Sequence, residues 1–180
     1  ALEASDEQLY ADYLAGDAAA FERLYGRYRQ PLFGFLRHSG LAQAECEDIY
    51  QDIWLGIAQL QRRFHGGNFR AWLYQVARNR LVDVRRRARV RDAASLDAIA
   101  DPPTPTPPPE RQADGTDCVQ RLVAGIAGLP EAQREAFLLR EETGLDLATI
   151  AEVVDAGVET VKSRLRYAMR KLREQLEDCL

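Results

Sequence analysis

Apolar residues recur at three- and four-residue spacing along most of the chain, which is the pattern of amphipathic α-helices. Capping residues such as Ser5 and Asp17, and glycines such as Gly16, mark where helices begin and end. The pattern therefore predicts an all-α protein. The predicted helices cover residues 5–16, 17–39, 42–61, 69–91, 117–128, 130–144, 147–154 and 158–176.

Several of these helices have broad apolar faces that are expected to form the core. The helix 17–39 is rich in aromatic residues, and Pro31 within it is expected to kink the helix or to end a first segment. The helix 69–91 carries a core-facing stripe that includes Leu73, Ala77 and Leu81. The helix 117–128 is expected to turn four apolar side chains inward: Val119, Leu122, Val123 and Ile126.

A proline-rich stretch divides the chain. Six of the eight prolines fall between Pro102 and Pro109, where the apolar content is too low to form a core. Such a stretch is expected to be a linker of extended polyproline character. The predicted organisation is two small helical domains, residues 1–95 and 117–180, joined by a linker at residues 96–116.

The helix 69–91 has a strongly basic surface, with eight arginines and one aspartate. The forked guanidinium group binds phosphate and can stack on a base, so a polyanionic partner is expected. Trp72 and Asn79 lie seven residues apart on one stripe, which suits unpaired bases. The alternative is a solvated basic face with Trp72 half-buried in the core.

Two further stretches of the first domain are candidate binding sites. The loop before the basic helix combines Gly66 and Gly67 with charged, aromatic and polar side chains, as a single-strand clamp would, although it also fits a plain connector. In the helix 42–61, Trp54 and Leu55 lie among carboxylates and resemble a protein-binding hot spot. The alternative is a surface helix with Trp54 turned partly inward.

The second domain contains the pattern of a helix-turn-helix: a short helix, the turn Asp155-Ala156-Gly157, and a longer helix. From Lys162 to Arg173 the longer helix has six bases and no acid. Its outward side chains suit base edges and phosphates in a DNA major groove, and the alternative is a basic helix in a plain bundle.

Composition adds several constraints. The net charge of −4 hides an acidic segment, since residues 1–60 hold ten acids and four bases. The three widely spaced cysteines predict a reducing compartment without a disulfide framework. No ligand spacing of a metal site, no cofactor motif, no nucleophile-base pair and no membrane span is recognisable, so we expect a cytoplasmic protein that is not an enzyme.

Four segments together resemble the sigma factors of bacterial RNA polymerase of the extracytoplasmic-function (ECF) type, in the sigma-70 family. They are ECEDIYQDIWLGI, FRAWLYQVARNRLVDVRRR, LPEAQREAFLLREETGLDLATIAEVV and the helix ending TVKSRLRYAMRKLRE. The resemblance covers both domains. The helix-turn-helix alone would be shared by many regulators, and a stand-alone helix-turn-helix regulator remains the alternative function.

The resemblance implies a promoter-specificity factor with three binding surfaces. The β′ clamp helices of core polymerase would bind Asp48, Gln51, Asp52, Trp54 and Leu55, and the β flap is a second polymerase contact. The −10 element would be melted and bound by Arg62, Phe64, His65, Asn68, Arg78 and Asn79, to which the basic helix adds Trp72, Arg85 and Arg86. The −35 element would be read by Thr160, Lys162, Ser163, Arg164 and Arg166. An anti-sigma factor or other inhibitory partner is also expected.

This chain departs from the family pattern at the helix-turn-helix. Asp155 stands where glycine is usual, and aspartate tolerates the left-handed conformation better than most residues. Glu159 places an acid at the start of the recognition helix, which suits the helix dipole but not a nearby phosphate. These departures bear on the −35 sequence preference and not on the fold.

Overall fold

The computed structural model describes residues 4–59, 63–94 and 116–179, and these ranges contain helices and no strand. The all-α prediction is confirmed. The predicted linker falls on residues outside the described ranges, apart from Thr116, so its conformation and the domain boundaries stay predictions. The elements are α1 (Asp6–Leu14), α2 (Ala18–His38), α3 (Gln43–Ala58), α4 (Phe69–Ala94), α5 (Thr116–Ala127), α6 (Glu131–Glu141), α7 (Leu147–Val154), α8 (Val158–Gln175) and the short 3-10 helix η1 (Glu177–Cys179).

Side-chain caps fix where several helices begin. The hydroxyl of Ser5 accepts a hydrogen bond from the backbone N–H of Gln8, and Asp17 accepts one from Ala19. Asp146 accepts a 2.8 Å bond from the backbone N–H of Thr149 at the start of α7. The backbone and hydroxyl hydrogen bonds from Thr149 lower the pKa of Asp146, because they favour its charged form. These caps satisfy N–H groups that have no partner within the helix.

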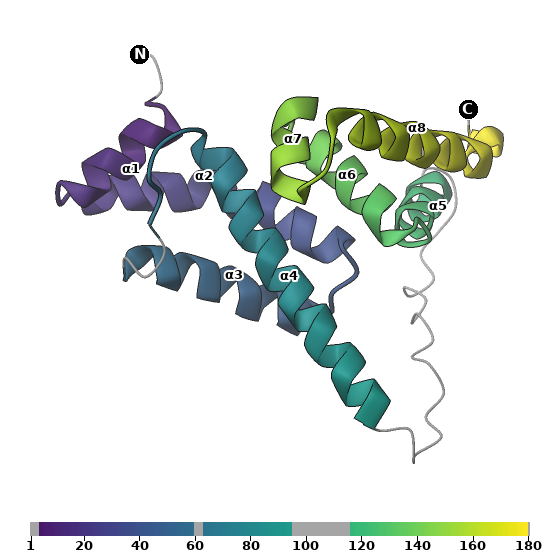
Figure 1. The fold of residues 1–180 in the computed structure, drawn as a ribbon, viewed down its shortest axis with the longest axis horizontal. Coiled ribbons are helices and arrows are strands. Elements are labelled where there is room, and N and C mark those ends of the chain that lie inside the picture. Colours follow the sequence, from purple (N-terminus) through teal and green to yellow (C-terminus); the bar gives the residue numbers. More distant parts are fainter. Residues whose placement is uncertain (1–3, 60–62, 95–115, 180) are drawn as a thin grey trace.

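Helix α4 links the two halves of the molecule. It packs on α1, α2 and α3 of the first half and on α7 of the second, and it runs diagonally between them (Figure 1). Phe69, Leu73, Ala77 and Leu81 are its fully buried apolar side chains, together with Tyr74. Part of its basic surface, including Arg78 and Arg85, faces the second half of the chain.

Helix α2 continues through Pro31, so of the two predicted outcomes, a kink or the end of a segment, the second is wrong. A proline inside a helix removes one backbone hydrogen bond and destabilises it by about 3 kcal/mol. Tyr28 before the proline and Leu32, Phe35 and Leu36 after it are all buried. Burial of apolar side chains on both sides of Pro31 outweighs the lost hydrogen bond.

Trp54 belongs to the core of the first half, and the interpretation of it as an exposed contact residue is wrong. Only 3% of the residue is exposed. Its ring lies 5.7 Å from that of Phe21 and 5.2 Å from that of Tyr25, both on α2, in edge-on arrangements. Trp54 packs inward against the aromatic face of α2 because aromatic rings in contact bury a large apolar area.

The second half contains the predicted helix-turn-helix, formed by α7 and α8. Asp155 in the turn has a φ of 50°, the left-handed conformation expected for it. The expectation for α5 is correct only in part, because Ile126 is buried whereas Val119 and Val123 are 61% and 48% exposed. Helix α5 packs on α8 and α2, and these partners leave the side of α5 that carries the two valines uncovered.

A disulfide joins Cys118 at the start of α5 to Cys179 in η1, although the cysteine spacing predicts no disulfide framework. The two cysteines are 61 residues apart in sequence, but the packing of α5 on α8 brings their Cα atoms to 5.8 Å. Cys46 is free and buried. Burial raises the pKa of its thiol, which makes it a weak nucleophile.

Loss of the disulfide should destabilise the second half. Replacing Cys118 by serine opens the 61-residue loop, and we expect the free energy of unfolding to fall by about 2–4 kcal/mol. Denaturant unfolding followed by circular dichroism measures this change. Reductant should lower the wild-type stability to that of Cys118→Ser and leave the variant unchanged. A wild-type protein that does not respond to reductant contradicts the pairing.

Truncation of Trp54 should act on stability. Because its ring is enclosed by other aromatic rings, Trp54→Ala is expected to lower the free energy of unfolding by about 3–5 kcal/mol. Trp54→Phe keeps an aromatic ring in the cluster and should lower it by much less. Thermal denaturation of the two variants tests this, and an unchanged melting temperature for Trp54→Ala would show that the ring is not a core residue.

Candidate functional site

The outer face of α3 is an acidic surface with one large apolar side chain. Asp48, Gln51 and Asp52 are exposed on it, and Leu55 is 56% exposed. Asp52 is held by a 2.6 Å ion pair with Arg80 of α4. The structure thus brings together four of the five predicted polymerase-binding residues, and Trp54 lies beneath them in the core.

The loop before α4 is tied to the core by its aromatic residue. Phe64 is half-buried and packs on Tyr10, Phe69 and Trp72, with ring centroids 5.3–5.7 Å apart. Trp72 is half-buried in the same cluster, which agrees with the alternative considered for it. Arg62 lies outside the described residues.

Arg63, His65 and Asn68 are the exposed polar side chains in the described part of this loop. The side-chain oxygen of Asn68 accepts a 3.0 Å hydrogen bond from the backbone N–H of Ala71, so it caps the start of α4. Gly66 and Gly67 have φ angles of 102° and 92°, which side-chain-bearing residues rarely adopt. The glycine pair therefore fixes the direction in which the chain enters α4.

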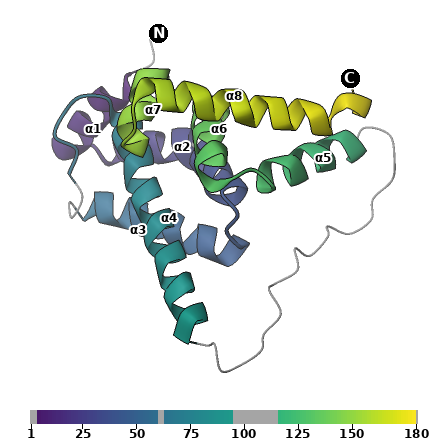
Figure 2. The same ribbon diagram turned by 45° about the vertical axis from the view of Figure 1, so that its right-hand side comes forward.

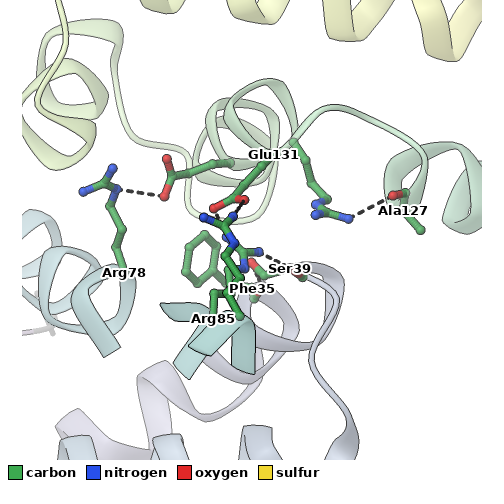
Figure 3. A network of polar contacts seen from close by, with 9 residues as sticks. Phe35, Ser39, Arg78, Arg85, Ala127 and Glu131 are labelled. Carbon is green, nitrogen blue, oxygen red and sulfur yellow. Dashed lines mark hydrogen bonds and ion pairs between the residues drawn. The ribbon is translucent and has the colours of Figure 1, made fainter. Parts of the chain in front are cut away.

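The predicted DNA-binding side chains of α4 fall into two groups. Asn79 and Arg86 are exposed to solvent. Arg78 and Arg85 instead face α6 and bind its carboxylates, as Figure 3 shows. The two groups differ because Arg78 and Arg85 lie on the face of α4 that meets the second half of the chain.

Two glutamates of α6 bind these arginines. Nε of Arg78 lies 2.8 Å from Oε1 of Glu135, and Nη1 of Arg85 lies 2.7 Å from Oε1 of Glu131. Arg85 also donates a 2.6 Å hydrogen bond to the carbonyl of Ser39. Sequence reasoning missed both glutamates. Their four-residue spacing places them on one face of α6, but nothing local indicates that this face meets α4.

The recognition helix α8 presents a basic outer surface. Thr160, Lys162 and Arg166 are exposed, whereas Ser163 and Arg164 are half-buried. Nζ of Lys162 lies 2.6 Å from a carboxylate oxygen of Glu159. Helix α8 runs along the outer edge of the molecule in both views (Figures 1 and 2). The five predicted −35 residues thus lie along one exposed helix.

The described residues contain neither a cluster of metal ligands nor a membrane-spanning helix. Within residues 4–59, 63–94 and 116–179, no three His, Cys, Asp or Glu side chains are grouped as metal ligands. In the same ranges no helix combines the length and apolar character that crossing a membrane requires.

Two family models match the chain. The model of Sigma-70 region 2 matches residues 24–91, which cover most of α2, all of α3 and most of α4. The model of Sigma-70 region 4 matches residues 125–174, which include the helix-turn-helix. The matches therefore fall on the helices that carry the three candidate surfaces.

A known protein of similar sequence supports the same family assignment. The ECF RNA polymerase sigma factor SigK of Mycobacterium sp. (strain KMS) is 32% identical over 168 residues, covering 89% of this chain and 84% of that protein.

Two solved structures share the fold at 24% identity. One is the sigma factor RpoE bound to the anti-sigma factor NepR from Bartonella quintana, with a TM-score of 0.64 over 81% of this chain and 89% of that one. The other is CnrH in complex with the cytosolic domain of CnrY, with a TM-score of 0.68 over 96% of this chain and 97% of that one. The chain belongs to the ECF sigma factors of the sigma-70 family, the promoter-specificity factors that bind core RNA polymerase and promoter DNA.

Proposed function

We propose that the work of promoter recognition is divided between a first domain, residues 1–95, and a second domain, residues 117–180, with residues 96–116 as the linker. The first domain binds the polymerase and the −10 element, and the second binds the −35 element. One observation carries this division: the exposed acidic face of α3 and the exposed basic face of α8 belong to different sigma regions.

The acidic face of α3 is the proposed contact for the β′ clamp helices. Leu55 supplies the exposed apolar contact, and Asp48, Gln51 and Asp52 surround it with polar groups. Interface hot spots have this arrangement of an apolar centre and a polar rim. Trp54 supports the face from within the core. The β flap is the proposed second polymerase contact.

The proposed −10 site combines α4 with the loop before it. Arg78, Arg85 and Arg86 offer guanidinium groups for phosphates, and Asn79 offers an amide for a base edge. Phe64, Trp72, His65, Asn68 and, from sequence alone, Arg62 complete the site. Each base stacked on an aromatic ring contributes about 1–3 kcal/mol, and an opened DNA step costs about 1.4 kcal/mol. Binding of a few bases therefore suffices to hold the strand open.

The proposed −35 site is the outer face of α8 placed in a major groove. Arg164, Arg166 and Lys162 would contact guanine edges and phosphates, and Thr160 and Ser163 would contact either. DNA opening driven by strand binding needs no catalytic residue, so the protein is proposed to be a non-enzymatic factor without cofactor or metal. It would act in the cytoplasm, where bacterial RNA polymerase transcribes the chromosome.

An anti-sigma factor is the proposed inhibitory partner. The support is structural likeness, since RpoE of Bartonella quintana was solved with the anti-sigma factor NepR and CnrH with part of CnrY. At 24% identity the likeness concerns the fold.

Run-off transcription with core polymerase tests the function as a whole. We expect specific transcripts from promoters that carry matching −10 and −35 elements, and weak, salt-sensitive DNA binding when the polymerase is omitted. Tight binding of the free protein to duplex operator DNA, without transcription, would instead identify a stand-alone regulator.

Substitutions on the exposed face of α3 should weaken polymerase binding. Asp48→Lys and Leu55→Ala are each expected to raise the dissociation constant for core polymerase by about tenfold or more, because both side chains are exposed on the proposed contact face. Glu22→Lys, an exposed reversal on α2, serves as the matched control. Binding is measured by fluorescence anisotropy, and circular dichroism checks that each variant is folded. Wild-type affinity of both variants would remove the α3 face from the interface.

Removal of a guanidinium from α8 should weaken −35 recognition. Arg164→Ala is expected to lower transcription from a promoter with an intact −35 element by about tenfold, because a lost base contact costs about 1–3 kcal/mol. The same variant should differ little from wild type on a promoter with a scrambled −35 element. Arg173→Ala, at the far end of α8, is the control. An equal loss on both promoters would assign Arg164 a role other than −35 reading.

A further inference from the structure

Helix α1 binds the loop that leads into α4. Oε1 of Glu7 accepts a 2.9 Å hydrogen bond from the backbone N–H of Phe69, the first residue of α4. The hydroxyl of Tyr10 accepts a 3.3 Å hydrogen bond from the backbone N–H of Phe64, near the start of the described part of the loop. Glu7 and Tyr10 are three residues apart, so they lie on one face of α1. That face therefore holds the loop at two points, and in both views the loop curves past α1 (Figures 1 and 2).

The ring of Tyr10 strengthens this attachment. Only 3% of Tyr10 is exposed, and its ring centroid lies 5.7 Å from that of Phe64 and 5.6 Å from that of Phe69. It also lies 6.4 Å from the ring of Trp72 on α4. Aromatic pairs at such distances stabilise a contact beyond the apolar area that they bury. Tyr10 thus binds the loop through both its ring and its hydroxyl group.

Helix α1 is itself fixed to the core of the first half. The carboxylate of Asp6 is buried and accepts hydrogen bonds from the side chains of Arg27 and Tyr28, both on α2. Leu9 is buried on the same helix. Hydrogen bonds to a buried carboxylate are strong, and breaking them leaves a charge without a partner, so a shift of α1 is costly. Glu7 and Tyr10 therefore project from a rigid support.

The tip of the loop, by contrast, has little packing of its own. A Cβ atom added at Gly66 or Gly67 would meet no atom of the described residues within 4 Å, its chain neighbours aside. His65 and Asn68 are exposed on either side of the glycines. Glycine restricts the backbone least, so the conformation of the tip depends on how its ends are held. Because ordering a loop costs free energy at the moment of binding, a loop held at its ends beforehand binds a ligand more tightly.

We propose that Glu7 and Tyr10 are positioning residues of the −10 site, which hold residues 63–68 in the conformation that receives bases of the opened strand. The inference rests on the proposed function, because it takes the side chains of this loop as −10 contacts. Glu7 and Tyr10 act through the loop and not on the DNA itself. Helix α1 precedes residues 24–91, which match Sigma-70 region 2, so the −10 site depends on a helix outside that region.

Promoter selectivity of the polymerase complex tests this role. The full chain is assembled with core polymerase and given two promoters that differ only in the bases of the −10 element. Tyr10→Phe keeps the ring but removes the acceptor for Phe64, and Glu7→Ala removes the acceptor for Phe69. Each should lower transcription from the intact promoter by about threefold to tenfold, the effect of one lost hydrogen bond, and change transcription from the altered promoter much less. Wild-type selectivity in both variants overturns the proposal.

Three control variants separate positioning from other effects. Tyr13→Phe makes the same change on the same helix, but the Tyr13 hydroxyl donates its bond to the carbonyl of Ala58 at the end of α3, so wild-type selectivity is expected. Glu22→Ala removes an exposed charge from α2 and should also be neutral. Glu7→Gln retains a side-chain oxygen for Phe69 and should restore most of the selectivity that Glu7→Ala loses. Tighter DNA binding by both Glu7 variants would instead show that the carboxylate repels phosphates, and would overturn the proposal.

Hydrogen exchange of the free chain measures the attachment without DNA or polymerase. Tyr10→Phe and Glu7→Ala should raise amide exchange rates in residues 63–69 by about threefold to tenfold and leave those of α2 and α3 unchanged. Unchanged exchange in the loop shows that α1 does not hold it, and faster exchange throughout α2 and α3 assigns the two residues to overall stability; either result overturns the proposal. Run-off transcription by the wild-type protein decides the sigma function separately, so the two can fail independently.

Discussion

The density of arginine on α4 is the constraint on which the rest of this fold depends. Eight guanidinium groups lie within residues 69–91, and none of them loses its charge at physiological pH. Repulsion between them is offset by carboxylates from two neighbouring helices, Asp52 of α3 on one side and Glu131 and Glu135 of α6 on the other. The arrangement of helices around α4 is therefore set by charge as well as by apolar packing, and part of its basic face is paired with carboxylates of the same chain.

Features that depend on local sequence could be predicted well. The spacing of apolar residues and the capping side chains give the helices to within a few residues, and the three-residue turn gives the helix-turn-helix. The left-handed conformation of Asp155 follows from its place in that turn. The exposed residues of α3 and α8 follow from helical periodicity alone, because a helix that buries one stripe must expose the other.

Features that depend on which faces meet could not be predicted. Trp54 is buried because the aromatic side chains of α2 lie opposite it, and the Cys118–Cys179 pair forms because α5 packs on the end of α8. Glu131 and Glu135 are as ordinary in sequence as any two acids one helical turn apart. Their importance comes from the contact between α4 and α6, which no periodicity within either helix specifies.

Gly34 shows how closely the two halves fit together. A Cβ atom at this position would lie 2.6 Å from Oε2 of Glu142. The carboxylate of Glu142 contacts Nδ1 of His38, so swinging away from an added methyl group would break that contact. The absence of a side chain at residue 34 therefore leaves room for the Glu142 carboxylate. A larger side chain at residue 34 would push the Glu142 carboxylate away and loosen the contact between α2 and the end of α6, without altering any charge.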